Sequence, residues 1–198
     1  MGPWINGGAW LTVEGQRTDI LLRDVDRVQA VLEQVAAGQV ESYYQPGHPH
    51  AILSAGYAAE VFHNRILHDP TGRLAALRAV VDPYPGPLAR ALVRQFGWEA
   101  GFSLANARSA ARRGDLTHVL GLAYRAVACL NQVVFARSRR YLVNEKGALA
   151  AADVLPSAPT AYRRRVEAAL SGLTTEPARL LAALDQLITL HEEVTANN

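Results

Sequence analysis

The sequence contains a single cysteine, Cys129, and this scarcity excludes an internal disulfide framework. Cys129 lies within an apolar helical pattern, so we expect a buried thiol in a reducing compartment. No apolar run approaches about 18 residues. The first residues also lack a basic segment followed by an apolar one, so neither a membrane span nor a signal peptide is predicted. These absences favour a cytoplasmic protein.

The sequence also lacks an excess of charge of either sign. Its 20 Lys and Arg residues and 18 Asp and Glu residues leave a formal net charge of +2 over 198 residues. Bulk charge therefore gives no reason to expect a nucleic-acid partner, and any basic surface must be local. Hydrophobic residues make up 49% of the chain, which is enough for the core of one large domain or two modest ones.

Prolines divide the sequence into two parts of different character. Three prolines lie between Pro83 and Pro87, where no helix can continue. Before them, short strand and helix patterns alternate, which predicts a small α/β layer in residues 1–83. After them, Ala-, Leu- and Arg-rich segments predict an antiparallel bundle of about four helices in residues 84–198. The predicted fold class is an α-rich α+β protein, a partial α/β layer followed by a helical bundle.

The first part opens with a predicted hairpin. Strand patterns at 9–13 and 17–22 flank Glu14-Gly15, where Gly suits a left-handed turn position. One acidic residue, Asp19, lies inside the apolar second strand. Because side chains alternate along a strand, Asp19 shares a face with Leu21. Asp19 is thus expected on a strand and not on a mobile loop.

Turn and capping residues place the remaining elements. Asp24 is a predicted N-cap of a helix that Gly38 ends. Residues 40–50 hold two prolines and a glycine and are predicted to form an exposed irregular loop. A corner from Arg112 to Asp115 predicts a turn between two antiparallel helices. The other expected elements are helices at 51–62, 73–81, 88–113, 116–141, 161–170 and 177–194, and a strand at 65–67.

Several motifs carry a resemblance to a known family. In order they are Asn6-Gly7-Gly8-Ala9-Trp10, Arg17-Thr18-Asp19-Ile20-Leu21-Leu22-Arg23-Asp24, Gly47-His48-Pro49-His50 and Leu67-His68-Asp69-Pro70-Thr71-Gly72-Arg73. Together these resemble nucleotidyltransferases of the polymerase-β superfamily, with bacterial aminoglycoside (kanamycin-type) nucleotidyltransferases as the nearest kin. The segments Asn131-Gln132-Val133-Val134-Phe135-Ala136, Arg139-Arg140-Tyr141 and Asn144-Glu145-Lys146-Gly147-Ala148 resemble the helical domain of those relatives.

The resemblance implies an activity and a metal site. The family transfers a nucleoside monophosphate from an NTP to a hydroxyl of a small molecule, so Mg²⁺ and NTP are the implied cofactors. In the family a Gly-Ser pair holds phosphates, and an Asp-x-Asp with a third carboxylate binds two Mg²⁺ ions. By its position and flanking residues, Asp19 matches the third carboxylate, which makes it the expected metal ligand and catalytic residue.

The chain departs from the family pattern at the rest of that metal site. It contains no Gly-Ser dipeptide, and no Asp-x-Asp precedes Asp19. Asp24-Val25-Asp26 has the spacing, but it lies at a helix start, where acids act as caps. We therefore expect a chain that is inactive alone, with the other ligands encoded upstream of Met1, lost, or supplied by another chain. A shortened layer leaves strand edges and apolar faces uncovered, which favours a homodimer.

Six other residues are candidates for the reaction. Glu60 and Glu99 each suit the base that takes a proton from a substrate hydroxyl, and each equally suits an ordinary solvated or ion-paired role. Arg140 and Lys146, with neighbouring arginines, suit nucleotide phosphates or the end of a helix dipole. The pair His48-Pro49-His50 suits half a metal site or two loop histidines.

Two other function classes remain open. The first is a non-catalytic, dimeric binding or interaction protein whose bundle holds a partner or a small molecule against the α/β layer. The second is a helical ribonuclease or toxin-like domain, because Arg113 to His118 fits a loose Arg-x4-His pattern. In that case His118 and Arg113 would act on a phosphodiester.

Overall fold

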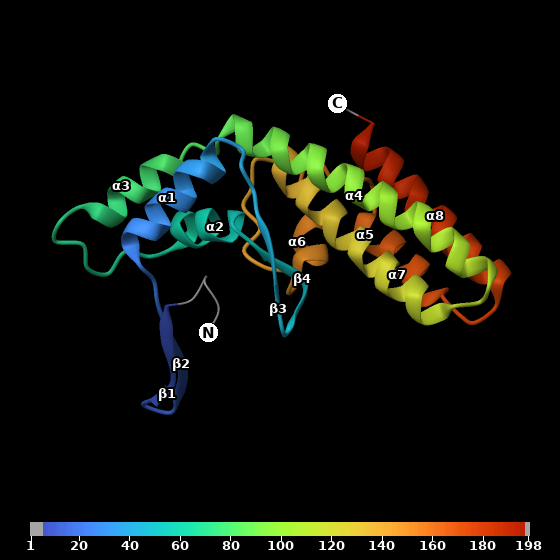
Figure 1. Cartoon of the computed structure of the whole chain (residues 1–198), viewed down its shortest axis with the longest axis horizontal. Helices are drawn as coiled ribbons and strands as arrows, with labels where there is room; N and C mark the ends of the chain where they lie inside the picture. The colour runs from blue at the N-terminus through green and yellow to red at the C-terminus, as the bar shows by residue number, and fades with distance from the viewer. Residues whose placement is uncertain (1–5, 197–198) are drawn as a thin grey trace.

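Helix α4 (Gly86–Arg112) runs along the molecule and connects its two ends (Figure 1). In this computed structural model, which describes residues 6–196, three helices gather at the first end of α4 and the bundle lies along the rest. Pro85 precedes α4 and Pro87 lies in its first turn, where the missing N–H group has no intrahelical partner to lose. The proline-rich segment therefore starts the longest helix.

The described elements confirm the α-rich α+β fold class. In chain order they are β1 (Gly7–Val13), β2 (Gln16–Leu22), α1 (Val25–Ala36), β3 (Ser42–Gln45), β4 (His48–Leu53), α2 (Ala55–His63), α3 (Arg73–Val81), α4, α5 (Leu116–Arg137), α6 (Ala148–Asp153), α7 (Tyr162–Ser171) and α8 (Pro177–Thr195). Of the predicted first part, residues 1–5 lie outside the described chain. Within residues 6–196 the strands form separate antiparallel hairpins and not the single layer expected.

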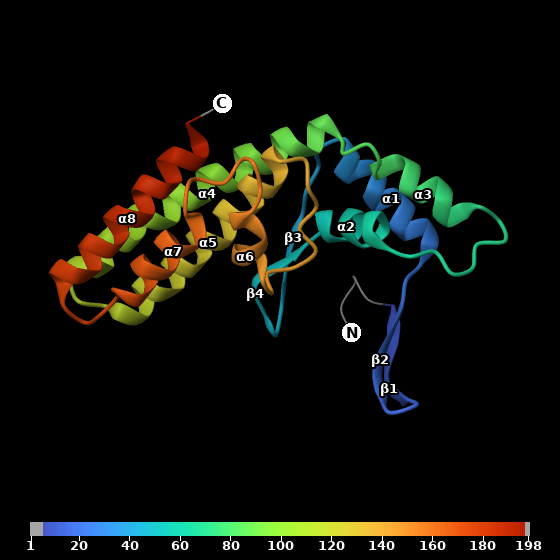
Figure 2. The same ribbon diagram turned by 180° about the vertical axis from the view of Figure 1, so that it is seen from behind.

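The predicted hairpin is confirmed as β1 and β2, and it projects from the body of the molecule (Figures 1 and 2). Trp10 pairs with Asp19, and Gly15 takes the left-handed turn conformation at φ +79°. The side chains on both faces are largely exposed, including Trp10 at 71% and Ile20 at 42%. An isolated two-stranded hairpin is marginally stable in water, and this one exposes apolar side chains on both faces.

Helix α1 begins and ends where its caps predict. The Asp24 side chain accepts hydrogen bonds from the backbone N–H groups of Asp26 and Arg27, and Gly38 follows the helix at φ +88°. The residues that α1 buries recur at helical spacing on one face: Val28, Val31, Leu32 and Val35. This face packs against α2 and α3 and forms the core of the first end.

Residues 40–50 are not the irregular loop that the prolines suggest. They form most of the hairpin β3–β4, which turns at Pro46-Gly47 with Gly47 at φ +86°. Ser42 pairs with Leu53, and the register is irregular between Tyr43 and Gln45, so Pro49 lies beside a disturbed part of the ladder. Helix α2 consequently starts at Ala55 and not at residue 51.

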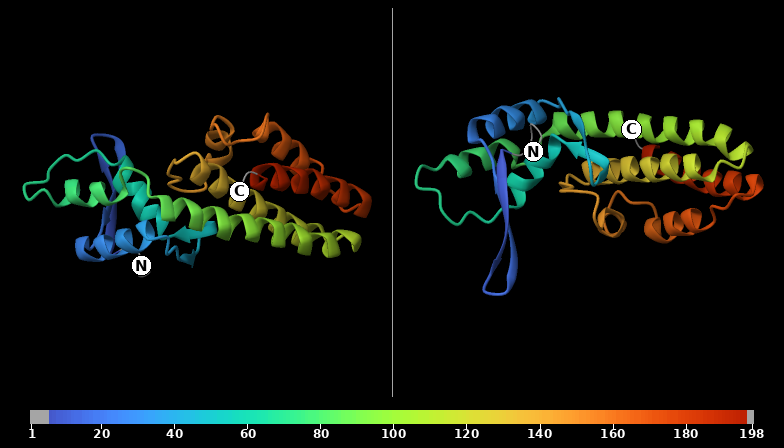
Figure 3. Two further views of the ribbon diagram at one scale, coloured as in Figure 1. Left: turned by 90° about the horizontal axis from the view of Figure 1, so that it is seen from above. Right: turned by 60° about the horizontal axis from the view of Figure 1, so that its bottom comes forward.

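The bundle forms from α4, α5, α7 and α8 (Figure 3). Gly114 at φ +70° ends the α4 turn and Asp115 caps α5, as the sequence predicts. Among the described helices, α5 alone is long and apolar enough to cross a membrane, but 72% of its apolar window is buried inside the bundle. Its apolarity is therefore that of a core helix. Cys129 lies there, and burial raises the pKa of its thiol to about 12.

Two smaller expectations were wrong, and one helix was missed. Residues 65–67 form no strand, and Leu67 is exposed. Helix α5 ends at Arg137 and not at residue 141, because Arg139 adopts a left-handed backbone at φ +53°. The short helix α6 was not predicted. The early end of α5 frees residues 138–147 to form a loop between the bundle and α2, and this loop carries much of the site described next.

Candidate functional site

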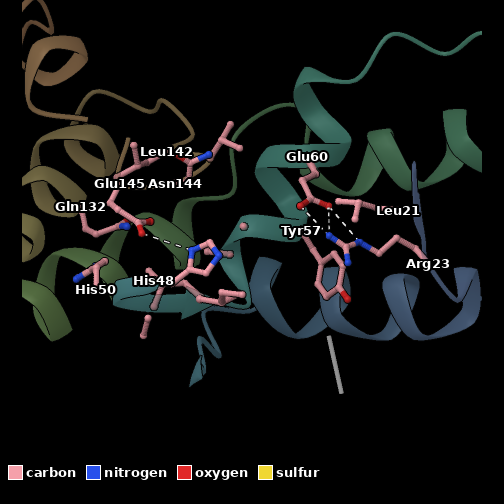
Figure 4. A pocket seen from close by; sticks show the side chains of 16 residues that line it. Leu21, Arg23, His48, His50, Tyr57, Glu60, Gln132, Leu142, Asn144 and Glu145 are labelled. Carbon is pink, nitrogen blue, oxygen red and sulfur yellow. Dashed lines mark hydrogen bonds and ion pairs between the residues drawn. The ribbon is translucent and has the colours of Figure 1, made fainter. Parts of the chain in front are cut away.

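A pocket of about 210 Å³ lies between β4, α2 and the loop that follows α5 (Figure 4). The end of the projecting hairpin closes one side with Leu21 and Arg23, and Gln132 reaches the pocket from α5. Ligand pockets commonly measure about 300–1,000 Å³. The volume therefore suits a small molecule, or one ring of a larger one.

One wall of the pocket carries an ion pair between Arg23 and Glu60. Nη2 of Arg23 lies 2.9 Å from Oε1 and 3.1 Å from Oε2 of Glu60, so both carboxylate oxygens accept hydrogen bonds. The guanidinium also lies over the Tyr57 ring, at 5.0 Å from its centroid. Burial raises the pKa of the Tyr57 hydroxyl. The pair joins the base of β2 to α2 and fixes the hairpin's entry beside the pocket.

The opposite wall carries a second acid–base pair, His48 and Glu145. Nδ1 of His48 lies 3.4 Å from Oε1 of Glu145, across the pocket mouth from the first pair (Figure 4). Both side chains are partly exposed. A carboxylate beside Nδ1 orients the imidazole and leaves Nε2 to take a proton from a bound hydroxyl. This pair has the arrangement of a general base and its orienting group.

The loop that presents Glu145 is held by aromatic packing. The Tyr141 hydroxyl donates a hydrogen bond of 2.8 Å to the carbonyl of Val81, and the ring lies 4.4 Å from that of Tyr84. Further along, Asn144 Oδ1 accepts a hydrogen bond from the Lys146 backbone. These contacts anchor the loop to the end of α3 and give the pocket a fixed wall.

A partly buried polar cluster supports β4 from beneath. Arg125 of α5 donates to the carbonyl oxygen of His50 and to its Nδ1, and its Nε lies 2.5 Å from Oε1 of Glu99. Burial, and then the Arg125 charge, lower the pKa of His50 to about 4, so its imidazole is neutral at pH 7. The next residue, Ala51, lines the pocket at φ +91°, a strained conformation for a residue with a Cβ.

Asp19 lies outside this pocket, exposed on β2. Leu21, two positions along the same strand, lines the pocket, so Asp19 shares that face but lies further out on the hairpin. Asp19 instead borders a surface depression with Trp10 and Arg17. The sequence-predicted metal ligand is therefore on the pocket side of the hairpin without being part of the pocket.

The described residues do not fit a Mg²⁺ pair. No group of three or more His, Cys, Asp or Glu side chains within residues 6–196 is placed to hold a metal ion. Asp19 has no second carboxylate beside it in the depression that it borders. Two divalent ions need several oxygen ligands on rigid elements. The described residues therefore do not supply the ligands of a two-metal catalytic centre.

The other predicted residues are dispersed. Glu60 lines the pocket, but Arg23 holds both of its oxygens. Glu99 belongs to the cluster beneath β4 and is not a pocket residue. Arg140 borders a separate small cavity beside Tyr84, and the Lys146 side chain is exposed just beyond the pocket wall. Of the five predicted residues, only Glu60 contributes directly to the pocket.

Sequence reasoning did not place His48 and Glu145 together. They are 97 positions apart in the chain, and the expected loop at 40–50 hid the strand that presents His48. A signal was nevertheless available. Both residues belong to motifs that carry the family resemblance, and so do Arg23 and Gln132. Segments that share one family pattern were candidates for one site.

The comparisons with known proteins give one family match. Residues 53–146 are similar to a family described as "Domain of unknown function (DUF4037)". The matched segment runs from the end of β4 to the pocket loop, so it contains α2, α3, α4 and α5 with two pocket walls. The searches of curated proteins and of solved structures each give no match.

Proposed function

We propose that this chain is a nucleotidyltransferase-like protein whose pocket holds the small-molecule hydroxyl acceptor. One observation carries the proposal. Four segments that bear the family resemblance meet at one pocket, where they contribute Arg23, His48, Gln132 and Glu145. Chance likenesses scattered over a sequence have no reason to converge in space.

In this proposal the two charged pairs have different roles. Glu145 gives the pocket a carboxylate, which suits an acceptor with hydroxyl and amino groups such as an aminoglycoside ring. His48, oriented by Glu145, takes the proton from the reacting hydroxyl. Glu60 instead positions the base of β2 through Arg23.

The nucleotide half of the reaction needs more than this chain supplies. Asp19 is the one carboxylate that the family pattern assigns to Mg²⁺ here, and one carboxylate does not hold a metal pair. We therefore propose that the chain binds acceptor without transferring a nucleotide by itself, in a cytoplasmic setting. Mg²⁺-dependent transfer from ATP to kanamycin that Asp19→Asn abolishes would overturn this part.

Calorimetric titration with kanamycin tests the acceptor pocket. Glu145→Gln removes one carboxylate charge at nearly constant shape, and we expect the Kd to rise about tenfold, as for the loss of one charge-assisted hydrogen bond. Glu167→Gln is the matched control, because Glu167 lies exposed on α7 with Arg163 as its partner. Equal Kd values for the two variants would remove the pocket from the proposal.

A second candidate function is the non-catalytic dimer. The exposed apolar side chains of β1–β2 favour it, since such a surface on a projecting hairpin is suited to a second copy of the chain. Light scattering of a concentration series tests it, and a monomer at every concentration would exclude it. The ribonuclease alternative gains no support from geometry, because Arg113 and His118 lie exposed at the α4–α5 turn and neither lines the pocket. RNA cleavage lost in His118→Ala remains its test.

A further inference from the structure

A second concave surface lies between α4, the end of α5 and α8, and it shares no lining residue with the acceptor pocket. We call it the basic groove. Its polar and aromatic lining residues are Arg90, Arg94, Trp98, Arg137, Arg139, Ser157, His191 and Thr195. No Asp or Glu is among the residues that line it in the described chain. The chain as a whole is nearly neutral, so this groove is a local concentration of positive charge.

The α4 wall of the groove has a regular spacing. Arg90, Arg94 and Trp98 of this wall, and Phe102 just beyond it, follow one another at intervals of four, so they form one stripe along the helix. With a rise of about 1.5 Å per residue, the stripe spans about 18 Å. Trp98 is 68% exposed and Phe102 55% exposed, and their rings stack with centroids 5.0 Å apart. The stripe thus presents cations at one end and a stacked aromatic pair at the other.

The arginines of this stripe differ from other arginines of the helical bundle. Further along α4, Arg108 forms an ion pair with Asp185, and Arg165 of α7 pairs with Glu193. Within the described chain neither Arg90 nor Arg94 has a carboxylate partner, although both are exposed. Unneutralised cations that line a concave surface attract an anion.

Close helix packing holds the floor of the groove. Nε2 of His191 on α8 lies 2.9 Å from the carbonyl oxygen of Gly97, and the Arg137 side chain donates a hydrogen bond to the carbonyl of Val194. A Cβ at Gly101 would lie only 3.0 Å from the His191 ring, so glycine allows this approach of α8 to α4. The groove is therefore a formed feature of the bundle and not a gap between mobile side chains.

We propose that the basic groove binds single-stranded nucleic acid. Arg90, Arg94 and Arg139 contact successive phosphates, and an unpaired base stacks on Trp98. Stacking on an exposed aromatic requires a base outside a duplex, which favours a single strand over double-stranded DNA. An acidic peptide would use the cations and leave the aromatic pair without a role.

Fluorescence anisotropy with a labelled twelve-residue oligothymidylate tests the proposal on the full chain. We expect the affinity to fall about tenfold in the double variant Arg90→Ala/Arg94→Ala and about tenfold in Trp98→Ala. With about three phosphates contacted, the logarithm of the binding constant should fall with the logarithm of salt concentration at a slope of about −2. A duplex of the same length should bind more weakly.

Matched controls distinguish binding in the basic groove from unspecific attraction to exposed arginines. Arg112→Ala/Arg164→Ala removes two exposed arginines that do not line the groove, and we expect less than a twofold change. Circular dichroism verifies that each variant folds. An equal loss in the control pair, unchanged binding in Trp98→Ala, or equal binding of polyglutamate would each overturn the proposal.

Discussion

The two β-hairpins have the same local architecture and very different surroundings. The hairpin β1–β2 projects from the body and exposes apolar side chains on both faces, whereas β3–β4 lies against α2 and the bundle (Figures 1 and 2). In β4, Leu53 and His50 are buried, and Arg125 holds the His50 carbonyl. In β2, Asp19 and Ile20 are exposed. An isolated two-stranded hairpin is marginally stable in water, so packing decides how rigid each one is.

The segments that carry the family resemblance therefore form two halves, one on the packed hairpin and the loop after α5, and one on the projecting hairpin. The half on β4 and the loop after α5 is preorganised, because the cluster of Arg125, Glu99 and His50 fixes the strand that presents His48. On β2, the Arg23–Glu60 ion pair fixes the end of the strand beside the pocket, whereas Asp19 lies exposed further out on the hairpin. A preorganised acceptor pocket can bind by itself, whereas a metal site cannot form from one exposed carboxylate.

The largest expected effect is a difference in unfolding free energy between one substitution in each hairpin. Leu53→Ala leaves a cavity in the core and should lower the free energy of unfolding by about 2–4 kcal/mol. Ile20→Ala should cost about 0.5 kcal/mol in the monomer, since the side chain is largely exposed. Urea unfolding at dilutions where light scattering shows a monomer measures both. A cost for Ile20→Ala equal to that for Leu53→Ala would contradict the assigned difference in packing.

The next effect depends on the neutral His50 beneath β4. Its folded pKa of about 4 lies below the ordinary value of 6.5, so as the pH falls the unfolded state binds the proton first. Stability is therefore fully present above about pH 6.5 and is lost as the pH falls toward 4. Between pH 7 and pH 4.5 the loss from this residue should be about 2–3 kcal/mol.

His50→Asn tests this prediction, because its amide oxygen can accept the Arg125 hydrogen bond but does not titrate. The variant should show a smaller difference in unfolding free energy between pH 7 and pH 4.5 than the parent chain. The comparison of two pH values cancels any constant cost of the substitution. Identical pH dependence in parent and variant would show that His50 is not the responsible group.

A smaller effect concerns the joint between the projecting hairpin and the body. The Asp24 side chain caps α1, and its backbone N–H donates to Asn6 Oδ1 at the base of β1. Asp24→Ala removes the cap and should lower the unfolding free energy by about 1 kcal/mol. Asp24→Asn, which keeps a capping oxygen, should recover most of it. Failure of Asn to recover stability would indicate that the charge and not the cap matters.

The smallest expected effect on the unfolding free energy concerns backbone strain at Ala51 in the pocket wall. Ala51 adopts φ +91° in β4, where a Cβ is unfavourable. Ala51→Gly should therefore raise the unfolding free energy by up to about 1 kcal/mol. Thermal unfolding measures it, with Ala58→Gly inside α2 as a destabilising control. A loss of stability at both positions would argue against strain at Ala51.

The sequence correctly predicted the elements that depend on nearby residues, such as helix caps, glycine turns and apolar stripes. The Asp24 cap, the Gly15 and Gly114 turns and the long apolar stripes of the bundle appear where the sequence places them. The hairpin β3–β4 was missed because its prolines are typical of loops. Part of its support is Arg125, which is 75 positions away from His50 in sequence, and no local rule includes such a contact.

The candidate site was predictable only in part for the same reason. The resemblance singled out the motifs, but the early end of α5 brings Glu145 to His48, and this end depends on the left-handed conformation of Arg139. Glu99 was a reasonable candidate base by type, yet in the fold it neutralises Arg125. Assigning a role to a charged residue requires its partner, and partners are set by tertiary packing.

The most direct test of the acceptor pocket is a map of its amide signals by NMR during titration with kanamycin. We expect shift changes that cluster in β4, the start of α2 and residues 142–145, with β1 and the α4–α5 turn unaffected. The same titration of Glu145→Gln should need about tenfold more ligand. Shift changes confined to other surfaces, or an unchanged titration in the variant, would contradict the assignment of this pocket as the acceptor site.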